Sequence, residues 1–429
     1  SMCVSKLHNR ALYAFLCFLP VALQIQATLF SNASYQGLRF NVADLLLPVA
    51  GTYILLSFYL KKSQWPKWDM KHTWLWLIAL LGVMSVALVN GYISNGYWSS
   101  WALVNKYIGF IILLCYFSLG GWLSTNFSQL GLSKEWLVRI FCGFCLVILS
   151  LSFVSTLIKP LTTTPMWLGE FPWDGLMANR NAFMVLTIFT VTFMEAYRLS
   201  KQPILPAWSY ALFWIIVPTF TVFNASRIGW IVGGVVLLGM LFKAPVHFVK
   251  KILPYLFIGC LAAYAGYLGS DKLIVKEGRM LQYLVDSVKQ NEITYQGDQA
   301  RFIALEDGLD LYGQSNPILG AGLGAYQEFQ KTKRGEFIDL IDWSALWLLV
   351  ETGGIGLFIF SAFFLMVWLN LYKKSLKEED VFARAMIISL TLIIALSFVH
   401  ELLYMRFLWL FLGMALIKNR NRVDVINQK

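Results

Sequence analysis

The chain has 429 residues, of which 58% are hydrophobic and 14% charged, and its mean hydropathy is +0.61. This composition is too apolar for a water-soluble domain of that length, so a bilayer must replace much of the surrounding water. The formal net charge of +11 comes mostly from short loops between apolar blocks. It therefore describes a membrane face, and nucleic-acid binding is excluded as its explanation.

Apolar blocks long enough to cross about 30 Å of hydrocarbon, roughly 20 residues each, recur along the chain. The chain divides into three predicted parts. They are residues 1–268 with helices 1 to 9, a long loop over 269–342, and residues 343–429 with helices 10 to 12 and a tail. The sequence thus predicts an all-α integral membrane protein. We expect about twelve transmembrane helices, over residues 11–30, 43–60, 74–92, 101–123, 136–158, 181–198, 206–223, 228–243, 252–268, 343–371, 383–402 and 404–418.

Basic residues are concentrated in alternate loops, which fixes the expected orientation. By the positive-inside rule the basic loops and both termini are cytoplasmic. The long loop is different, because residues 271–342 hold 8 Lys and Arg against 12 Asp and Glu, and we expect it outside. The basic residues that define the cytoplasmic side are Lys61, Lys62, Lys67, Lys71, Lys134, Arg198, Lys201, Lys243, Lys250, Lys251, Lys373, Lys374, Lys377, Lys418, Arg420 and Arg422.

A few arginines lie on the expected outer side, where the positive-inside rule does not explain them. Arg180 begins the sixth helix, Arg227 begins the eighth, and Arg301 lies in the long loop. A guanidinium group binds phosphate oxygens in a fork, and a lipid pyrophosphate lies at that depth of the membrane. The alternative is that each arginine reaches lipid headgroups or pairs with a local carboxylate such as Asp174 or Glu306.

Two carboxylates and a histidine are the remaining candidates. Asp342 precedes the tenth helix, and Glu351 follows nine residues later, which places the two on roughly opposite faces of a continuous helix. Glu351 is either functional or a hydrogen-bonding residue that holds the bundle together, and the second role is favoured. His400, next to Glu401, closes the eleventh predicted helix. An interfacial structural role is favoured for it over catalysis.

The run from Gly320 to Gly324 follows Asn316 and Pro317. Its backbone N–H groups can face an anion, but the Lys-Ser/Thr of a phosphate-binding loop is missing, so a tight turn against the bundle is favoured. The six cysteines lie in or beside apolar blocks, and neither a disulfide framework nor a metal site is predicted from them.

Five local patterns, in order, resemble those of the O-antigen ligase/polymerase superfamily of bacterial envelope enzymes. The resemblance covers residues 170–415 and the twelve-helix layout. The patterns are Asn179-Arg180-Asn181 entering a helix, Ser226-Arg227 with Gly229-Trp230, Arg301 ahead of Asn316-Pro317 and the glycine run, Leu346 to Gly356 with Glu351-Thr-Gly-Gly-Ile-Gly, and His400 with the final helix.

The resemblance implies a GT-C-like helical bundle with a large periplasmic loop between the ninth and tenth helices. Members of this family transfer a glycan from undecaprenyl pyrophosphate to a sugar hydroxyl at the periplasmic face of the inner membrane. They use no nucleotide sugar, and the ligases use no metal, so no cofactor is expected. The implied partners are the lipid-linked donor, a glycan or lipid A core acceptor, membrane lipids and a chain-length regulator.

By the same resemblance, Arg227 and Arg301 match arginines that bind the donor pyrophosphate, and Arg180 joins them as a third candidate. The supporting residues are Asn179, Asn181, Glu351 and Arg279. Ligases carry His-Asn four residues before the leucine of the tenth helix, where this chain has Asp342-Trp343 before Leu346. A carboxylate can take the acceptor proton in an inverting transfer. We therefore expect Asp342 to be the base, with His400 as the second candidate.

This departure from the ligase pattern slightly favours a surface-polysaccharide polymerase, and an O-antigen ligase is the alternative. A lipid-linked oligosaccharide flippase is more remote, because such transporters are built from inverted repeats with charges in both halves, and no such repeat is visible. A cell-wall polymerase of the shape, elongation and division type also uses a lipid pyrophosphate, but the arginine positions suit it less well.

Overall fold

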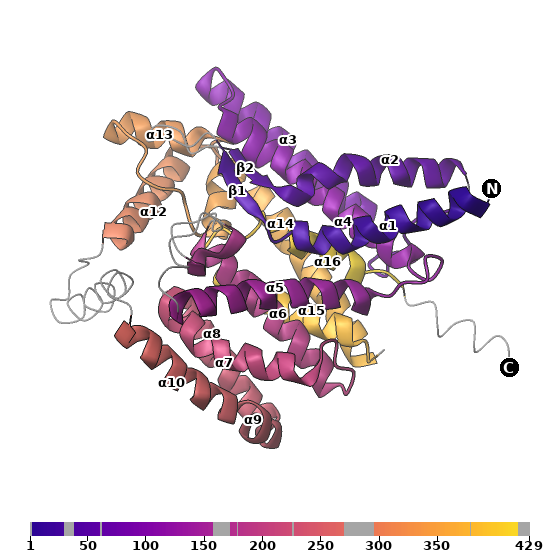
Figure 1. The fold of residues 1–429 in the computed structure, drawn as a ribbon. Helices are drawn as coiled ribbons and strands as arrows, with labels where there is room; N and C mark the ends of the chain where they lie inside the picture. Colours follow the sequence, from indigo (N-terminus) through magenta and orange to yellow (C-terminus); the bar gives the residue numbers. More distant parts are fainter. Residues whose placement is uncertain are drawn as a thin grey trace.

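The computed structural model describes residues 2–29, 38–60, 62–157, 172–177, 179–224, 227–269, 296–377 and 379–418. Within these ranges the chain is almost entirely helical, with one two-stranded sheet, and Figure 1 shows most helices packed side by side as a bundle. The elements are α1 (Met2–Ala22), β1 (Gln26–Leu29), β2 (Leu38–Asn41), η1 (Val42–Leu45), α2 (Leu46–Tyr59), α3 (Thr73–Asn95), the π-helical η2 (Trp101–Ile108), α4 (Gly109–Asn126), α5 (Lys134–Leu157), η4 (Pro172–Met177), α6 (Arg180–Leu199), α7 (Ala207–Asn224), α8 (Arg227–Lys243), α9 (Pro245–Lys251), α10 (Leu253–Gly269), α12 (Gln296–Gln314), α13 (Ala325–Arg334), α14 (Ser344–Lys377), α15 (Val381–Leu396) and α16 (Arg406–Ala415).

Seven of the described helices are long and apolar enough to cross a membrane, or eight if the bent pair α8–α9 is one span. The seven match predicted segments, and the pair, bent by 116°, matches the eighth predicted segment. The remaining predicted segments correspond to shorter apolar helices, namely Leu12–Ala22, Leu253–Gly266, Val381–Leu396 and Arg406–Ala415. The chain is a membrane-embedded helical protein, and the total of twelve spans stays a prediction.

The short helix α16 lies at the centre of the bundle and is buried along its whole length. Gly120 of α4 and Gly413 of α16 let the two backbones touch, because a Cβ at either position would overlap a carbonyl group of the other helix. Such small residues are how membrane helices approach closely. Trp409 stacks on Phe363 of α14 on another side. A helix enclosed in this way does not need to span the hydrocarbon alone.

The loops predicted to be cytoplasmic gather at one end of the bundle. Lys374, at the end of α14, pairs with Asp69 at 2.7 Å and donates a hydrogen bond to the carbonyl oxygen of Ala415 at 3.0 Å. Lys134 at the start of α5 lies 3.9 Å from Asp380, which precedes α15. These contacts agree with the prediction that the loops after even-numbered helices share one side of the membrane.

The opposite end carries the hairpin β1–β2, the helices α12 and α13 and the glycine run (Figure 1). The predicted first helix, 11–30, is wrong at its end, because α1 stops at Ala22 and β1 follows. Buried Gln24 explains the stop, since its side-chain amide donates to the carbonyl oxygens of Pro20 at 3.1 Å and Phe141 at 2.8 Å. The side chain thus satisfies a carbonyl group of the last turn and ties it to α5.

The eleventh predicted helix, 383–402, also ends early, because α15 stops at Leu396. The chain then leaves the helical path, and the hydroxyl group of Ser344 donates a hydrogen bond to the carbonyl oxygen of His400 at 3.2 Å. His400 and Glu401 therefore do not close a helix. They lie in a non-helical connection between α15 and α16, outside the membrane-spanning helices.

The glycine run forms a tight turn against the bundle, as predicted. Gly320, Gly322 and Gly324 all have positive φ angles, of 71°, 96° and 82°. A Cβ at Gly322 would overlap the backbone of Gly91 in α3, and one at Gly320 would overlap the backbone of Gly353 in α14. The turn is therefore wedged between α3 and α14, where only glycine fits.

Candidate active site

A cavity of about 310 Å³ lies at the end of the bundle that carries the hairpin. Its lining comes from five separate parts of the chain and contains polar, charged and apolar side chains. They are Gln26, Thr28 and Arg39 of the hairpin, Trp101 of η2, Met177, Asn179, Asn181 and Ala182 around the start of α6, Leu340 and Asp342 before α14, and His400, Glu401, Leu402 and Met405 before α16.

Asp342, the predicted base, forms an ion pair with Arg301 of α12. The Nε atom of Arg301 lies 2.9 Å from the Oδ2 atom of Asp342, and the side chains are 38% and 29% exposed. Burial raises the pKa of Asp342 to about 6, although the charge of Arg301 pulls this pKa downward. A carboxylate with a pKa close to neutral is well matched to accepting a proton.

His400, the second predicted base, is buried beside the same pair. Burial, together with the positive charges of Arg301 and Arg180, lowers the pKa of its ring to about 4. Two of the predicted phosphate-binding arginines, from α12 and α6, thus act on one ring. At neutral pH this ring is uncharged, so the excess positive charge of the region comes from the arginines.

The side chains of two asparagines hold the start of α6 in the cavity wall through hydrogen bonds. The side-chain oxygen of Asn179 accepts from the backbone N–H groups of Asn181 at 2.8 Å and Ala182 at 3.1 Å. The side-chain amide of Asn224 donates to the carbonyl oxygen of Arg180 at 3.0 Å. Asn179 and Asn181 line the cavity, and the helix dipole adds positive potential at this end of α6.

A second group of charges in the cavity wall was missed from the sequence. The carboxylate of Glu401 lies 3.4 Å from Arg39 of β2 and 3.3 Å from Lys106 of η2. Lys106 was counted within an apolar block, although a lone ionisable residue in such a block is a functional candidate by default. Arg39 lies in the first loop on the expected outer side, and it was not included among the candidate arginines there.

Glu351 does not line the cavity, and its contacts are structural. One oxygen accepts a hydrogen bond from the backbone N–H of Gly324 at 3.1 Å, and the other accepts one from the indole N–H of Trp347 at 2.8 Å. Glu351 therefore ties the glycine turn to α14. These contacts are the ones expected for the favoured prediction, in which Glu351 holds the bundle together.

Two predicted site residues cannot be placed. Arg227 begins α8, but its side chain lies outside the described residues, as does the whole of Arg279. Apart from Glu351, the structure brings the other predicted site residues together at or beside the cavity. They are Arg180, Arg301, Asp342, His400, Asn179 and Asn181.

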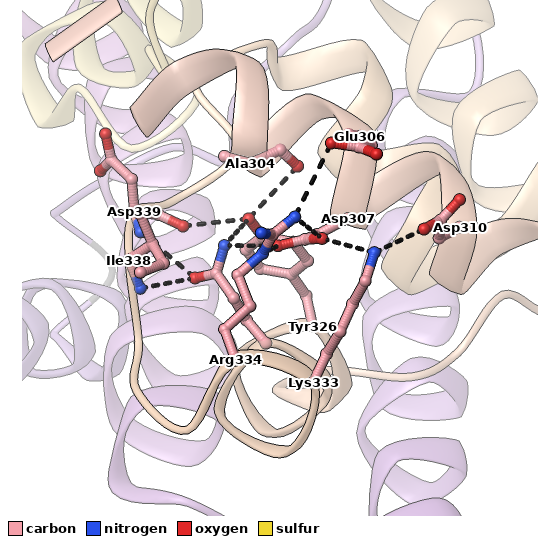
Figure 2. A network of polar contacts seen from close by, with 10 residues as sticks. Ala304, Glu306, Asp307, Asp310, Tyr326, Lys333, Arg334, Ile338 and Asp339 are labelled. Carbon is pink, nitrogen blue, oxygen red and sulfur yellow. Dashed lines mark hydrogen bonds and ion pairs between the residues drawn. The ribbon is translucent and has the colours of Figure 1, made fainter. Parts of the chain in front are cut away.

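The helix that carries Arg301 is held by a network centred on the fully buried Asp307 (Figure 2). Arg334 of α13 binds both oxygens of Asp307, at 2.7 and 2.8 Å, and Lys333 donates to one of them at 2.8 Å. Burial alone would raise the pKa of Asp307, but the hydrogen bonds from Arg334, Lys333 and Gln330 outweigh it and hold this pKa well below its usual range. The network fixes α12 against α13.

The segment leading to Asp342 is anchored to the same network (Figure 2). The hydroxyl group of Tyr326 donates to the carbonyl oxygen of Asp339 at 3.0 Å, and the side-chain oxygen of Gln330 accepts from the backbone N–H of Ile338 at 2.8 Å. Arg301 and Asp342 therefore meet on a rigid support, which precise chemistry requires.

Within the described residues, no three side chains of His, Cys, Asp and Glu are grouped so that they can hold a metal ion. The cavity instead offers cations that can bind an anion, and carboxylates that can accept a proton or a hydroxyl group. Comparison with protein-family models gave no match, and a search of curated proteins gave no significant match. The function is therefore inferred from the chemistry of the site itself.

Proposed function

We propose that the chain is an inner-membrane glycosyltransferase that moves a glycan from a lipid-linked pyrophosphate to a sugar hydroxyl at the periplasmic face. A surface-polysaccharide polymerase is slightly favoured over an O-antigen ligase. The proposal includes the twelve-span topology, with the loop 269–342 outside the membrane and the termini inside.

The supporting observation is the balance of charge around one cavity. Among the described residues, the basic side chains at or beside it outnumber the carboxylates, and they come from the hairpin, η2, α6 and α12. The pyrophosphate of a lipid-linked glycan carries one negative charge on each phosphate, and Arg180 and Arg301 can bind these charges without a metal ion. The basic residues are Arg39, Lys106, Arg180 and Arg301, and the carboxylates are Asp339, Asp342 and Glu401.

The reaction follows from these positions. The hydroxyl oxygen of the acceptor attacks the anomeric carbon of the donor sugar, and the bond from that carbon to the pyrophosphate oxygen breaks. The hydroxyl proton passes to Asp342, while Arg301 and Arg180 stabilise the charge on the departing lipid pyrophosphate. Attack from the face opposite the leaving group inverts the anomeric centre.

The test is glycan transfer by the purified protein in proteoliposomes that contain the lipid-linked donor. We expect Arg301→Ala and Arg180→Ala each to lower transfer by about 10- to 100-fold, because each removes charged hydrogen bonds worth about 1.5–3 kcal/mol. Arg384→Ala, on α15 near the other end of the bundle, is the matched control and leaves transfer unchanged. Near-normal transfer by both cavity variants would contradict the proposal.

Arg227→Ala checks the resemblance independently, since the resemblance to the O-antigen ligase/polymerase superfamily predicts a similar loss. A flippase would translocate a fluorescent lipid-linked glycan without any acceptor, and this acceptor-free assay separates transport from transfer.

Polymerase and ligase are distinguished by deleting the gene and separating the envelope glycans on a gel. A single repeat unit on the lipid A core indicates a lost polymerase. Bare core with accumulated lipid-linked polymer indicates a lost ligase.

A further inference from the structure

Glu401 is enclosed in the cavity wall in a way that the transfer step described above does not use. Its side chain is only 7% exposed, and the Oε2 atom alone receives both cations, Lys106 at 3.3 Å and Arg39 at 3.4 Å. The Oε1 atom is buried and has no hydrogen-bond partner among the described residues. Leaving a buried acceptor unpaired costs about 1–3 kcal/mol, so such an atom calls for a donor from a ligand.

The ammonium group of Lys106 is enclosed, and its ion-pair partner is Glu401. Its side chain is 3% exposed. The ammonium group lies 4.1 Å from the ring centre of Trp347 and 4.7 Å from that of Tyr404. Aromatic rings hold a cation through their negative faces. Lys106 is therefore held between these rings and Glu401, and its role is to orient the carboxylate of Glu401.

Arg39 of the hairpin is held in place by contacts with η2. Its guanidinium group lies 5.3 Å from the ring centre of Trp101, and its backbone N–H donates to the side chain of Asn105 in η2 at 3.0 Å. The neighbouring hairpin residues that line the cavity, Gln26 and Thr28, are uncharged and carry both donors and acceptors. This side of the cavity therefore presents hydroxyl-binding groups around one charged acceptor.

The charged groups around the cavity fall into two chemically different sets. The arginines of α6 and α12 lie beside Asp342 and His400, and this set suits a diphosphate. Glu401, which follows His400 in the chain, pairs instead with Arg39 of the hairpin, whose residues Gln26 and Thr28 also line the cavity. A sugar offers hydroxyl donors, so it fits the second set better than the first.

We propose that Glu401, Arg39, Gln26 and Thr28 form the binding site for the acceptor sugar. In it, the Oε1 atom of Glu401 accepts a hydrogen bond from a sugar hydroxyl group close to the one that reacts. Lys106 is a positioning residue that acts through Glu401. This inference rests on the proposed function and deepens it, because it places the acceptor on the hairpin side and the leaving pyrophosphate on the α6 and α12 side.

The test separates the two substrates. The donor is the lipid-linked glycan in proteoliposomes. The acceptor is added as the repeat-unit oligosaccharide released from its lipid by mild acid, or as purified lipid A core. Donor binding is measured separately by retention of radiolabelled lipid-linked glycan on the proteoliposomes. We expect Glu401→Gln to raise the acceptor KM at least tenfold and to leave donor binding unchanged.

Two further variants keep the outcome clear if Glu401→Gln folds poorly. Gln26→Ala leaves the ion pairs intact and raises the acceptor KM severalfold. Lys106→Met acts through Glu401, so it raises the acceptor KM with little change in donor binding. A purely structural defect would weaken acceptor binding and donor binding together. Glu328→Gln, on α13 outside the cavity lining, is the matched control and changes neither.

Two results would overturn the inference in different ways. Product formed by both wild type and Glu401→Gln with equal acceptor KM would refute the acceptor site and leave the proposed function standing. Donor binding by the wild type without product from either acceptor would refute the proposed function, and the acceptor site with it.

Discussion

The pKa of Asp342 gives the most direct test of its role as the base. Only the ionised carboxylate can take the acceptor proton, so activity must fall as the pH drops through the pKa of Asp342, which is raised to about 6. The sign is fixed, because protonation removes the base and the rate is lost on the acid side. Neither a sugar hydroxyl nor a pyrophosphate diester titrates in the same range.

The magnitude follows from the ionised fraction. With a pKa of about 6, roughly nine-tenths of Asp342 is ionised at pH 7 and roughly one-tenth at pH 5. We therefore expect kcat/KM for transfer to fall about tenfold between pH 7 and pH 5. Asp342→Asn should lower kcat by about 10²- to 10⁴-fold, the usual contribution of a positioned base, and abolish the acid limb.

The assay is the pH profile of kcat/KM, obtained from initial transfer rates in proteoliposomes at acceptor concentrations well below KM, from pH 4 to 8. The profile also decides between the two candidates, because burial and the nearby arginines lower the pKa of His400 to about 4. With His400 as the base, the acid side of the profile would be centred near pH 4. If this fall in rate disappears in His400→Ala and remains in Asp342→Asn, the assignment of Asp342 is refuted and His400 is the base.

Two predictions concern the support of the site. Asp307→Asn should destabilise the packing of α12 on α13, seen as faster amide hydrogen exchange in α12, because it removes the buried carboxylate charge that Arg334 and Lys333 bind. In the wild type the stability that this contact adds is fully present above the ordinary carboxylate pKa, and it is lost as the pH falls from there through the lowered folded-state pKa of Asp307. Gly322→Ala should lower the thermal melting temperature, because φ is 96° and the methyl group would overlap Gly91. Gly313→Ala, with no atom near the added methyl group, is the control and should be neutral. Equal melting temperatures for both glycine variants would show that the turn is not wedged.

The sequence was most informative where local chemistry decides structure. Loops with Lys374 and Lys134 were assigned to one side from charge alone, and the contacts of both residues lie at one end of the bundle. The glycine run was predicted as a turn because it lacks the Lys-Ser/Thr of a phosphate-binding loop, and the structure gives Gly320, Gly322 and Gly324 positive φ angles.

Contacts between distant parts of the chain were beyond sequence reasoning. Arg301 and Asp342 were each singled out, but their pairing depends on the way α12 and α13 fold back through Asp307, which no spacing reveals. Lys106 was hidden because one charge scarcely changes the average hydropathy of its block, and its partner Glu401 lies 295 residues away in the chain. The hairpin was missed because the apolar residues after Ala22 extend a hydropathy window past the true end of α1.

The π-helical turn η2 holds Lys106 in register with Glu401 while α4 continues to its glycine contact with α16. Removing one residue from η2 would turn one side of that junction by about 100° relative to the other, because each residue of an ordinary helix rotates by that angle. A related protein with a regular helix at this point would have to carry its basic residue at a different position to reach the same carboxylate. Aligning such proteins column by column would then hide an equivalence that only superposition in space reveals.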